Sequence, residues 1–164
     1  MANVGDKRER DVDDKDSDSD SDEEIDYDTI VYTSYSRKPT DEELNEYYRL
    51  AYSSKGFLVP VIGGTIHGGI EPYDFTDESD KQCVTDLAKQ AMQFYNEKNN
   101  ASFEFDHIVR VNSQVVAGYV FYITFIGCSA GNNATQTFYG KVWKKFYDLG
   151  TIVKFCETDL ECIS

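Results

Sequence analysis

The sequence predicts an α+β fold, in which one long helix lies across one face of a curled antiparallel sheet of four to five strands. Three features of the 164 residues lead to this prediction. Apolar side chains recur at helical spacing over one long segment, strand-like alternation follows in consecutive segments, and the start of the chain is acidic and poor in apolar residues. A helix followed by a run of strands is typical of α+β domains, whereas parallel sheets alternate strands with helices.

Residues 1–28 form a strongly acidic segment, with thirteen Asp and Glu side chains against four Lys and Arg, a net charge of −9. The whole chain carries −14, so the other 136 residues hold only −5. Because this segment has little to bury and repels itself, we expect a disordered acidic tail. Ser17, Ser19 and Ser21 each stand between acidic residues, the setting that acidophilic kinases prefer, although a purely solubilising tail explains the composition equally well.

Residues 29–62 are expected to form an N-terminal extension with one short helix. Residues 30–33 are β-branched and aromatic, which is compatible with an edge strand. Thr40 and Glu43 have the spacing of a capping box, and apolar residues then recur at helical spacing as far as Gly56. Residues 57–62 are apolar, and the glycine pairs Gly63-Gly64 and Gly68-Gly69 that follow mark turns or close backbone approaches.

The long helix is predicted to begin near Thr76 or Asp77, either of which can cap it, and to end at about Lys98. Its apolar residues recur at spacings of three and four, so they line one broad face that the sheet must cover. That face comprises Cys83, Val84, Leu87, Ala88, Ala91, Met92, Phe94 and Tyr95.

Four segments after this helix have strand character. Apolar residues alternate with a period of two along each of the first two strands, so within each strand they lie on one face. The residues are Phe103, Phe105, Val109 and Val111 in the first strand, and Tyr119, Phe121, Ile123 and Phe125 in the second. His107 shares the face of Phe105 and Val109, so it is interpreted as a structural histidine. Residues 137–145 and 151–155 predict two further strands.

Short motifs in this second half resemble the cystatin family, and the plant cystatins in particular. Residues 114–118, Gln-Val-Val-Ala-Gly, have the Q-x-V-x-G form of the first inhibitory hairpin and lie between two alternating strands. Residues 87–92, followed by Asn96, Lys98 and Asn100, resemble the helix signature of plant cystatins. Residues 138–143 resemble their L-Y-E-A-K-V-W strand, and residues 68–72 their G-G-V-E-P segment. The resemblance covers residues 63–156, so we expect a cystatin-like domain at residues 63–164.

The resemblance implies a reversible inhibitor of papain-like cysteine proteases, with no catalytic residue and no cofactor of its own. In the family's mechanism an N-terminal trunk and two hairpin turns form an apolar wedge that fills the protease cleft. The trunk would contain Gly68 or Gly69, with Ile66 and His67 running into the cleft, and Gly63-Gly64 is the alternative. The turns would present Gln114, Val115, Val116, Ala117 and Gly118 in the first, and Phe146 and Tyr147 in the second.

Three departures from the plant pattern favour an alternative function. Gln90 stands where the family has Phe, Tyr95 where it has His, and Phe146-Tyr147 where it has Pro-Trp. Loss of the tryptophan anchor and of the proline's fixed backbone angle predicts a weaker or more selective inhibitor. The alternative is a non-inhibitory cystatin-related protein that binds an unknown partner through residues 1–62, because one fold can serve several functions.

The composition argues against other classes of function. The acidic balance disfavours nucleic-acid binding, no apolar run has the length of a membrane span, and no phosphate loop or metal-ligand spacing occurs. The four cysteines form no C-x-x-C pair, and Cys83 or Cys128 with His67 or His107 matches no hydrolase motif. Since no signal-peptide pattern opens the chain, we expect a cytoplasmic or nuclear monomer with reduced thiols.

Overall fold

The computed structural model describes residues 37–64 and 66–163. The predicted acidic tail at residues 1–28, with Ser17, Ser19 and Ser21, and the predicted edge strand at residues 30–33 lie outside the described residues. In chain order the elements are α2 (Asp41–Ser53), β1 (Ile70–Pro72), α3 (Glu78–Asn99), β2 (Phe103–Val116), β3 (Gly118–Ser129), β4 (Thr135–Lys145) and β5 (Thr151–Glu157), with 3-10 turns at Phe146–Asp148 and Leu160–Cys162.

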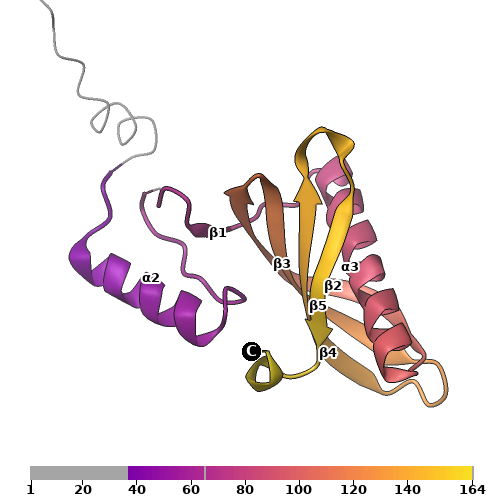
Figure 1. The fold of residues 1–164 in the computed structure, drawn as a ribbon. Coiled ribbons are helices and arrows are strands. Elements are labelled where there is room, and N and C mark those ends of the chain that lie inside the picture. The colour runs from indigo at the N-terminus through magenta and orange to yellow at the C-terminus, as the bar shows by residue number, and fades with distance from the viewer. Residues whose placement is uncertain (1–36, 65, 164) are drawn as a thin grey trace, which may run out of the picture.

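The strands form one antiparallel sheet of five, in the order β1-β2-β3-β4-β5, so each strand pairs with its neighbour in sequence. The long helix α3 lies across one face of this sheet (Figure 1). This arrangement confirms the α+β prediction of one helix on a curled antiparallel sheet.

The helix α3 has defined ends that its sequence supplies. The Asp77 side chain accepts a hydrogen bond of 2.9 Å from the Ser79 amide, and Asn100 ends the helix with a left-handed backbone at φ 49°. The Asn96 side chain then bridges to both backbone groups of Phe103, which fixes the start of β2 against the helix end. The bounds agree with the prediction to within one or two residues.

The main core lies between α3 and the inner face of the sheet. Every helix residue in it belongs to the face predicted from the spacing, and the sheet contributes alternate residues of β3 and β4. Its fully or nearly buried members are Val84, Leu87, Ala88, Ala91, Met92, Val111, Phe121, Ile123, Phe125, Phe138, Val142 and Cys156.

The prediction for β2 was wrong in its middle. The pairing of β2 with β3 shifts register between Phe105 and His107 and again between Ile108 and Arg110. Each irregularity changes which face the next side chain occupies, so Ile108 packs on the core while Val109 is 54% exposed. His107 is likewise exposed, with its Nδ1 2.6 Å from Asp106, and does not share the face of Phe105.

The outer face of the sheet carries a second, smaller core that the N-terminal extension completes. Phe57 is 1% exposed and its ring meets those of Tyr122, Tyr139 and Phe155 edge-on or tilted at 5.3–6.0 Å. The buried Asn112 side chain donates hydrogen bonds of 2.9 Å to the carbonyl oxygens of Gly56 and Phe57. Residues 56–57 of the extension are therefore packed on the sheet, a point that the sequence had left open.

The short helix α2 begins where the capping box predicted. The Glu43 amide donates to the Thr40 hydroxyl, and the Thr40 amide donates to the Glu43 carboxylate at 2.8 Å. Arg37 also binds this carboxylate, and together these bonds lower the pKa of Glu43 to about 2, with Arg37 the largest cause. These bonds fix the first turn of α2.

Candidate functional site

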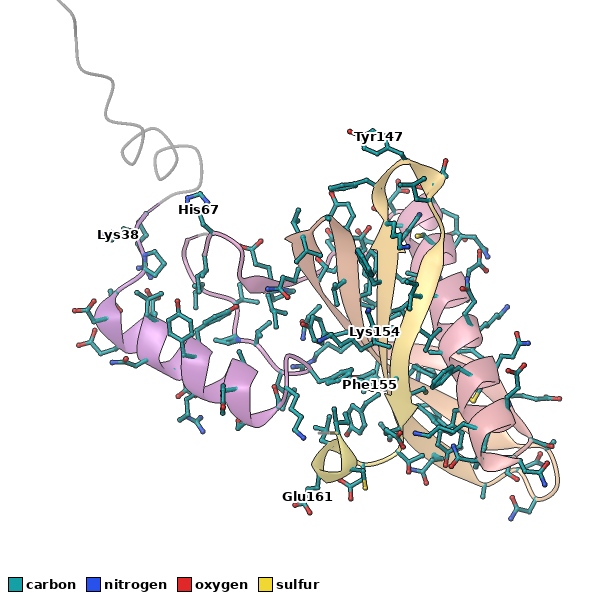
Figure 2. The ribbon with its side chains drawn as sticks, viewed as in Figure 1. Lys38, His67, Tyr147, Lys154, Phe155 and Glu161 are labelled. Atoms are coloured by element: carbon teal, nitrogen blue, oxygen red, sulfur yellow. The ribbon has the colours of Figure 1, made fainter. Side chains whose placement is uncertain are left out.

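The three predicted contact segments lie at one end of the sheet. Ile70, next to the Gly68-Gly69 pair, stands opposite Gln114 in the pairing of β1 with β2. Gly118, which begins β3, stands opposite Lys145, where β4 ends and the second turn begins. The trunk, the turn between β2 and β3 and the turn between β4 and β5 are therefore neighbours, with Tyr147 at the tip of the second turn (Figure 2).

The first turn presents two valines to solvent. Val115 is 57% exposed and Val116 42% exposed, so residues 114–118 are not packed inside the molecule. Gly118 has φ +125°, and a Cβ there would lie 2.3 Å from the Lys144 carbonyl oxygen, so only glycine fits this close approach of two strands. The Trp143 indole donates a hydrogen bond of 3.2 Å to the Ala117 carbonyl and supports the turn from the neighbouring strand.

The trunk reverses direction at its glycines. The Gly69 amide donates to the Ile66 carbonyl at 2.9 Å, and Gly68 has φ +68°, so residues 66–69 form a tight turn. Ile66 therefore folds back against Gly69, and the entry of Ile66 and His67 into a protease cleft stays a prediction. In Figure 2 His67 lies near Lys38, beside the start of α2.

The alternative trunk, Gly63-Gly64, lies in different surroundings. An added Cβ at Gly63 would meet the Arg37 side chain at 2.9 Å, and one at Gly64 would meet the Arg37 carbonyl oxygen at 2.4 Å. These glycines let the chain pass close to the segment before α2. Gly68-Gly69 is therefore the pair adjoining the first turn.

Two tyrosines that the sequence analysis did not single out hold the trunk in place. The Tyr47 hydroxyl of α2 donates to the Ile70 carbonyl at 2.8 Å and accepts from the Ile70 amide at 2.7 Å. On the other side, the Gln114 side chain donates to the Gly68 carbonyl at 2.8 Å and accepts from the Tyr122 hydroxyl at 3.2 Å. The sequence signal of Tyr47 was apolar spacing, which predicts burial and not a hydrogen bond across 23 residues of chain. Tyr122 lies between the residues of the predicted apolar alternation and had no such signal.

The second turn exposes the aromatic ring of Tyr147 on a strained backbone. Tyr147 and Asp148 both have left-handed φ values, 56° and 52°, and the Leu149 amide donates to the Phe146 carbonyl at 3.3 Å. Two left-handed central residues define a type I′ turn, which usually contains Asn and Gly. Tyr147 is 91% exposed at the tip, whereas Phe146 packs edge-on against Tyr119 at 5.7 Å. The Tyr147 ring is therefore exposed to solvent, whereas the Phe146 ring packs against the sheet.

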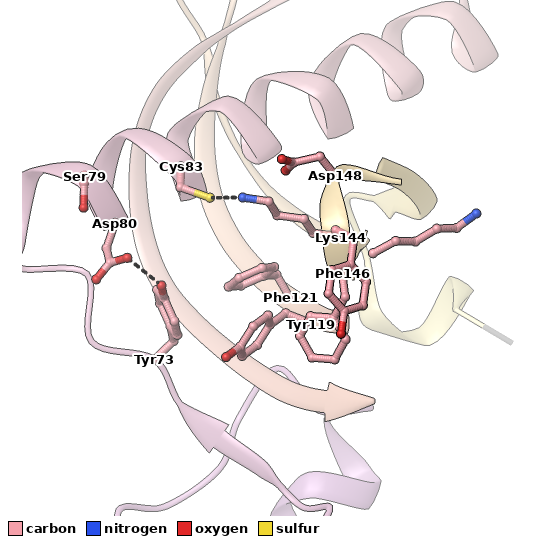
Figure 3. Close-up of a pocket in the computed structure, with 11 residues that line it drawn as sticks. Tyr73, Ser79, Asp80, Cys83, Tyr119, Phe121, Lys144, Phe146 and Asp148 are labelled. Carbon is pink, nitrogen blue, oxygen red and sulfur yellow. Dashed lines mark hydrogen bonds between the residues drawn. The ribbon is translucent and has the colours of Figure 1, made fainter. Parts of the chain in front are cut away.

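A pocket of about 520 Å³ lies behind the second turn, between the start of α3, the start of β3 and the end of β4 (Figure 3). The Tyr73 hydroxyl donates to Asp80 at 2.9 Å, and burial followed by this bond raises the pKa of Tyr73 to about 12. Lys144 donates to the Cys83 sulfur at 3.4 Å. Neither His67 nor His107 is among the described residues that line this pocket, so neither stands beside the Cys83 thiol as a base would.

Residues 37–64 and 66–163 contain neither a cluster of metal ligands nor a membrane-crossing helix. Over these ranges no three His, Cys, Asp or Glu side chains gather as a metal site would need. Neither α2 nor α3, within the same ranges, combines the length and apolar character of a membrane-crossing helix. Cys83, Cys128, Cys156 and Cys162 are free thiols.

One helix on a five-stranded antiparallel sheet, with three turns gathered at one end, is the architecture of the cystatin class. A sequence model of the cystatin domain matches residues 68–155, and the chain belongs to the cystatin family. It is 41% identical over 83 residues to Cysteine proteinase inhibitor 1 of Oryza sativa subsp. japonica, covering 51% of this chain and 56% of that protein. It is 34% identical over 85 residues to Cysteine proteinase inhibitor of Hordeum vulgare, covering 52% of this chain and 77% of that protein.

The match to longer relatives is partial. The chain is 35% identical over 96 residues to Multicystatin of Solanum tuberosum, covering 58% of this chain but 11% of that protein. The chain thus spans about half of the length of the rice relative and about a tenth of the length of the potato relative. Salivary cystatin of the soft tick Ornithodoros moubata has a solved structure with a TM-score of 0.46 and 17% identity, covering 57% of this chain and 99% of that chain.

Proposed function

We propose that this protein inhibits papain-like cysteine proteases by inserting the trunk and the two turns into the active-site cleft. The observation that supports this best is the exposure of Val115 and Val116 beside Gly68-Gly69, at the end of the sheet that also carries Tyr147. Apolar surface gathered on one edge is what a cleft between two protease lobes can receive. Cysteine proteinase inhibitors of rice and barley are relatives over this same region.

The geometry supports a preorganised wedge. Trp143, Gln114 and Tyr47 hold the first turn and the trunk through hydrogen bonds that exist before any partner binds. A binding edge ordered in advance loses less conformational entropy on association, which favours affinity. The Tyr147 ring then supplies the exposed aromatic anchor that the family's tryptophan would otherwise provide.

The test is a titration of papain with the full chain and with Val115→Asp. A charged residue in a dry contact should weaken inhibition by about a hundredfold or more, because an unpaired buried charge costs several kcal/mol. Val109→Asp is the matched control, since Val109 is 54% exposed and Val115 57% exposed, and Val109 lies at the β2 irregularity and not in the turn. Equal inhibition by the two variants, or no inhibition by a folded wild-type chain, would reject the proposal.

One observation favours the alternative, a cystatin-related protein that binds a partner through its extension. α2 is packed beside the trunk, and together they line an open groove of about 610 Å³. Tyr48 and Tyr52 of α2 are 57% and 91% exposed beside it. Loss of a cellular partner on Tyr48→Ala and Tyr52→Ala substitution, with papain inhibition absent in every variant, would support this second function.

A further inference from the structure

A basic aromatic patch lies on the outer face of the sheet. We define it as Lys141, Trp143, Lys145 and Lys154. The amino groups of Lys145 and Lys154 lie 5.2 and 5.0 Å from the centre of the Trp143 ring, and that of Lys141 lies 5.0 Å from the centre of the Tyr122 ring. Figure 2 shows Lys154 on the side of the sheet that faces away from α3. Three cations are thus concentrated in a chain whose net charge is −14.

The positive charge of the patch is not neutralised within the described part of the chain. The ion pairs in this part join Arg37 to Glu43, Arg49 to Glu46, Lys98 to Glu157 and His107 to Asp106, so none includes a lysine of the patch. Burial lowers the pKa of Lys141, and the charge of Lys154 lowers it further. Like charges held together in this way favour the approach of an acidic partner.

The patch adjoins the first turn. Lys145 stands opposite Gly118 in the sheet, and Trp143 donates its indole hydrogen bond to Ala117. Anything that lies across Trp143 and Lys145 therefore contacts the edge of residues 114–118. A ligand of the patch and a ligand of the first turn would compete for the same space.

The chain itself contains a ligand with the complementary charge. Residues 11–24 hold nine Asp and Glu and one Lys, a net charge of −8. The twelve residues 25–36 join this acidic segment to the start of the described chain, and fully extended they reach about 40 Å. A globular domain of this size has a radius of gyration of about 14 Å, so the linker can cross it.

We propose that residues 11–24 bind in cis to the patch formed by Lys141, Trp143, Lys145 and Lys154. A tether of this length gives an effective concentration in the millimolar range, so several weak ion pairs suffice to hold the segment. Each exposed pair contributes little and is screened by salt, so the contact is reversible and sensitive to ionic strength. Phosphate on Ser17, Ser19 or Ser21 would add charge and strengthen it.

The docked segment lies over the edge of the first turn and competes with a protease for it. This consequence rests on the proposed function, whereas the docking itself does not. The acidic segment then lowers the affinity of the inhibitor for the protease. The size of this effect depends on the salt concentration and on phosphorylation. The competing occupant of the patch is an acidic surface on the protease, and the experiment below separates the two.

Zero-length carbodiimide coupling of the full chain, read by mass spectrometry, tests the docking directly, because it joins only carboxylates and amines that are in contact. We expect acids of residues 11–24 to couple to Lys145 and Lys154 about tenfold more often than to Lys81, an exposed lysine on α3, in low salt where the screening length exceeds about 10 Å. Mixing light and heavy isotope-labelled chains identifies couplings within one molecule. Equal coupling to all three lysines, or coupling only between molecules, would overturn the proposal.

A second arm uses paired variants. Lys145→Glu with Lys154→Glu should abolish the coupling of residues 11–24 to Lys141, whereas Lys81→Glu with Lys89→Glu should leave it unchanged. Replacing the acids of residues 13–24 by Asn and Gln should tighten papain inhibition about threefold to tenfold at low salt and have no effect near 0.5 M salt, where screening acts within about 4 Å. If the patch variants weaken inhibition while no tail coupling occurs, the patch faces the protease and the cis contact is rejected. If papain is not inhibited at all, the coupling result still decides the docking.

Discussion

The Gln114 side chain donates a hydrogen bond of 2.8 Å to the Gly68 carbonyl oxygen, and this bond joins the first turn to the trunk across 46 residues of chain. Both groups lie on the edge proposed to enter a protease cleft. The same glutamine accepts from Tyr122, so the trunk, the turn and the outer core form one hydrogen-bonded unit.

Removing the glutamine should loosen the trunk without unfolding the domain. Gln114→Ala is expected to weaken papain inhibition about twofold to tenfold, because a trunk that has lost a hydrogen bond worth about 0.5–1.5 kcal/mol must be ordered on binding. Stability in urea should change by less than about 1 kcal/mol, since the site is at the sheet end. Gln82→Ala, which removes an exposed glutamine bonded to Asp86 on α3, is the matched control and should leave inhibition unchanged. Equal inhibition constants for both variants would show that the trunk bond is irrelevant.

A substitution at Tyr147 in the second turn should increase the stability of the fold and weaken protease binding. Tyr147→Asn places a residue that tolerates left-handed geometry at φ 56° and should stabilise the fold by about 0.5–1 kcal/mol. The same substitution removes the exposed ring and should weaken papain inhibition about tenfold or more. Thermal unfolding and the inhibition constant measure the two effects.

Tyr52→Asn is the control for this pair of effects, because Tyr52 and Tyr147 are both 91% exposed. It removes an equally exposed ring from α2 and should leave inhibition intact. A loss of inhibition in Tyr52→Asn equal to that in Tyr147→Asn would indicate that α2, and not the second turn, meets the protease.

Phe57 should carry most of the attachment of the extension to the sheet. Phe57→Ala empties the outer core beside Tyr122 and is expected to cost about 3–5 kcal/mol, as aromatic deletions in cores do. Residues 54–60 should then become sensitive to limited proteolysis while α3 stays protected. Val61→Ala, at a position 88% exposed, should change neither property. Uniform loss of protection over the whole domain would mean that the extension is part of one cooperative unit.

Stability should fall in alkaline solution because of Cys156. Burial, with the charge of Glu157 adding, raises the pKa of Cys156 to about 12, whereas the ordinary value is 9.0. Since the unfolded thiol releases its proton first, the stabilising contribution is complete below pH 9 and is lost as the pH rises towards 12. Within that window the free energy of unfolding should fall by up to about 1.4 kcal/mol per pH unit.

The dependence of the unfolding free energy on pH is measured by urea unfolding at several pH values. A change in packing alters the free energy at every pH, whereas ionisation of the thiol alters this slope. Cys156→Ala should reduce the slope, leaving above pH 10 the part that Tyr73 contributes, and Cys162→Ala, at an exposed thiol, should leave the slope unchanged. Parallel slopes for the wild type and Cys156→Ala would exclude Cys156 as the cause.

The local patterns that predicted well depend on neighbours in sequence. The caps at Thr40 and Asp77 and the apolar face of α3 follow from contacts within one helical turn, and the structure has them where the pattern indicated. Strand β2 shows the limit of such reasoning. Its alternation was disrupted at His107 and Val109 by two irregularities, which depend on how β2 pairs with β3 and leave no signal in a period-two pattern.

The fold class, the family and the candidate segments 68–69, 114–118 and 146–147 could be read from the sequence, because periodicity and short motifs are local properties. The three-dimensional structure was needed to show that these segments share one end of the sheet, that the trunk turns back at Gly68 and that Phe57 packs on the outer face. It also placed Tyr47 and Tyr122 on either side of the trunk. These relations join residues far apart in the chain, and they arise from strand pairing and side-chain packing that no local pattern encodes.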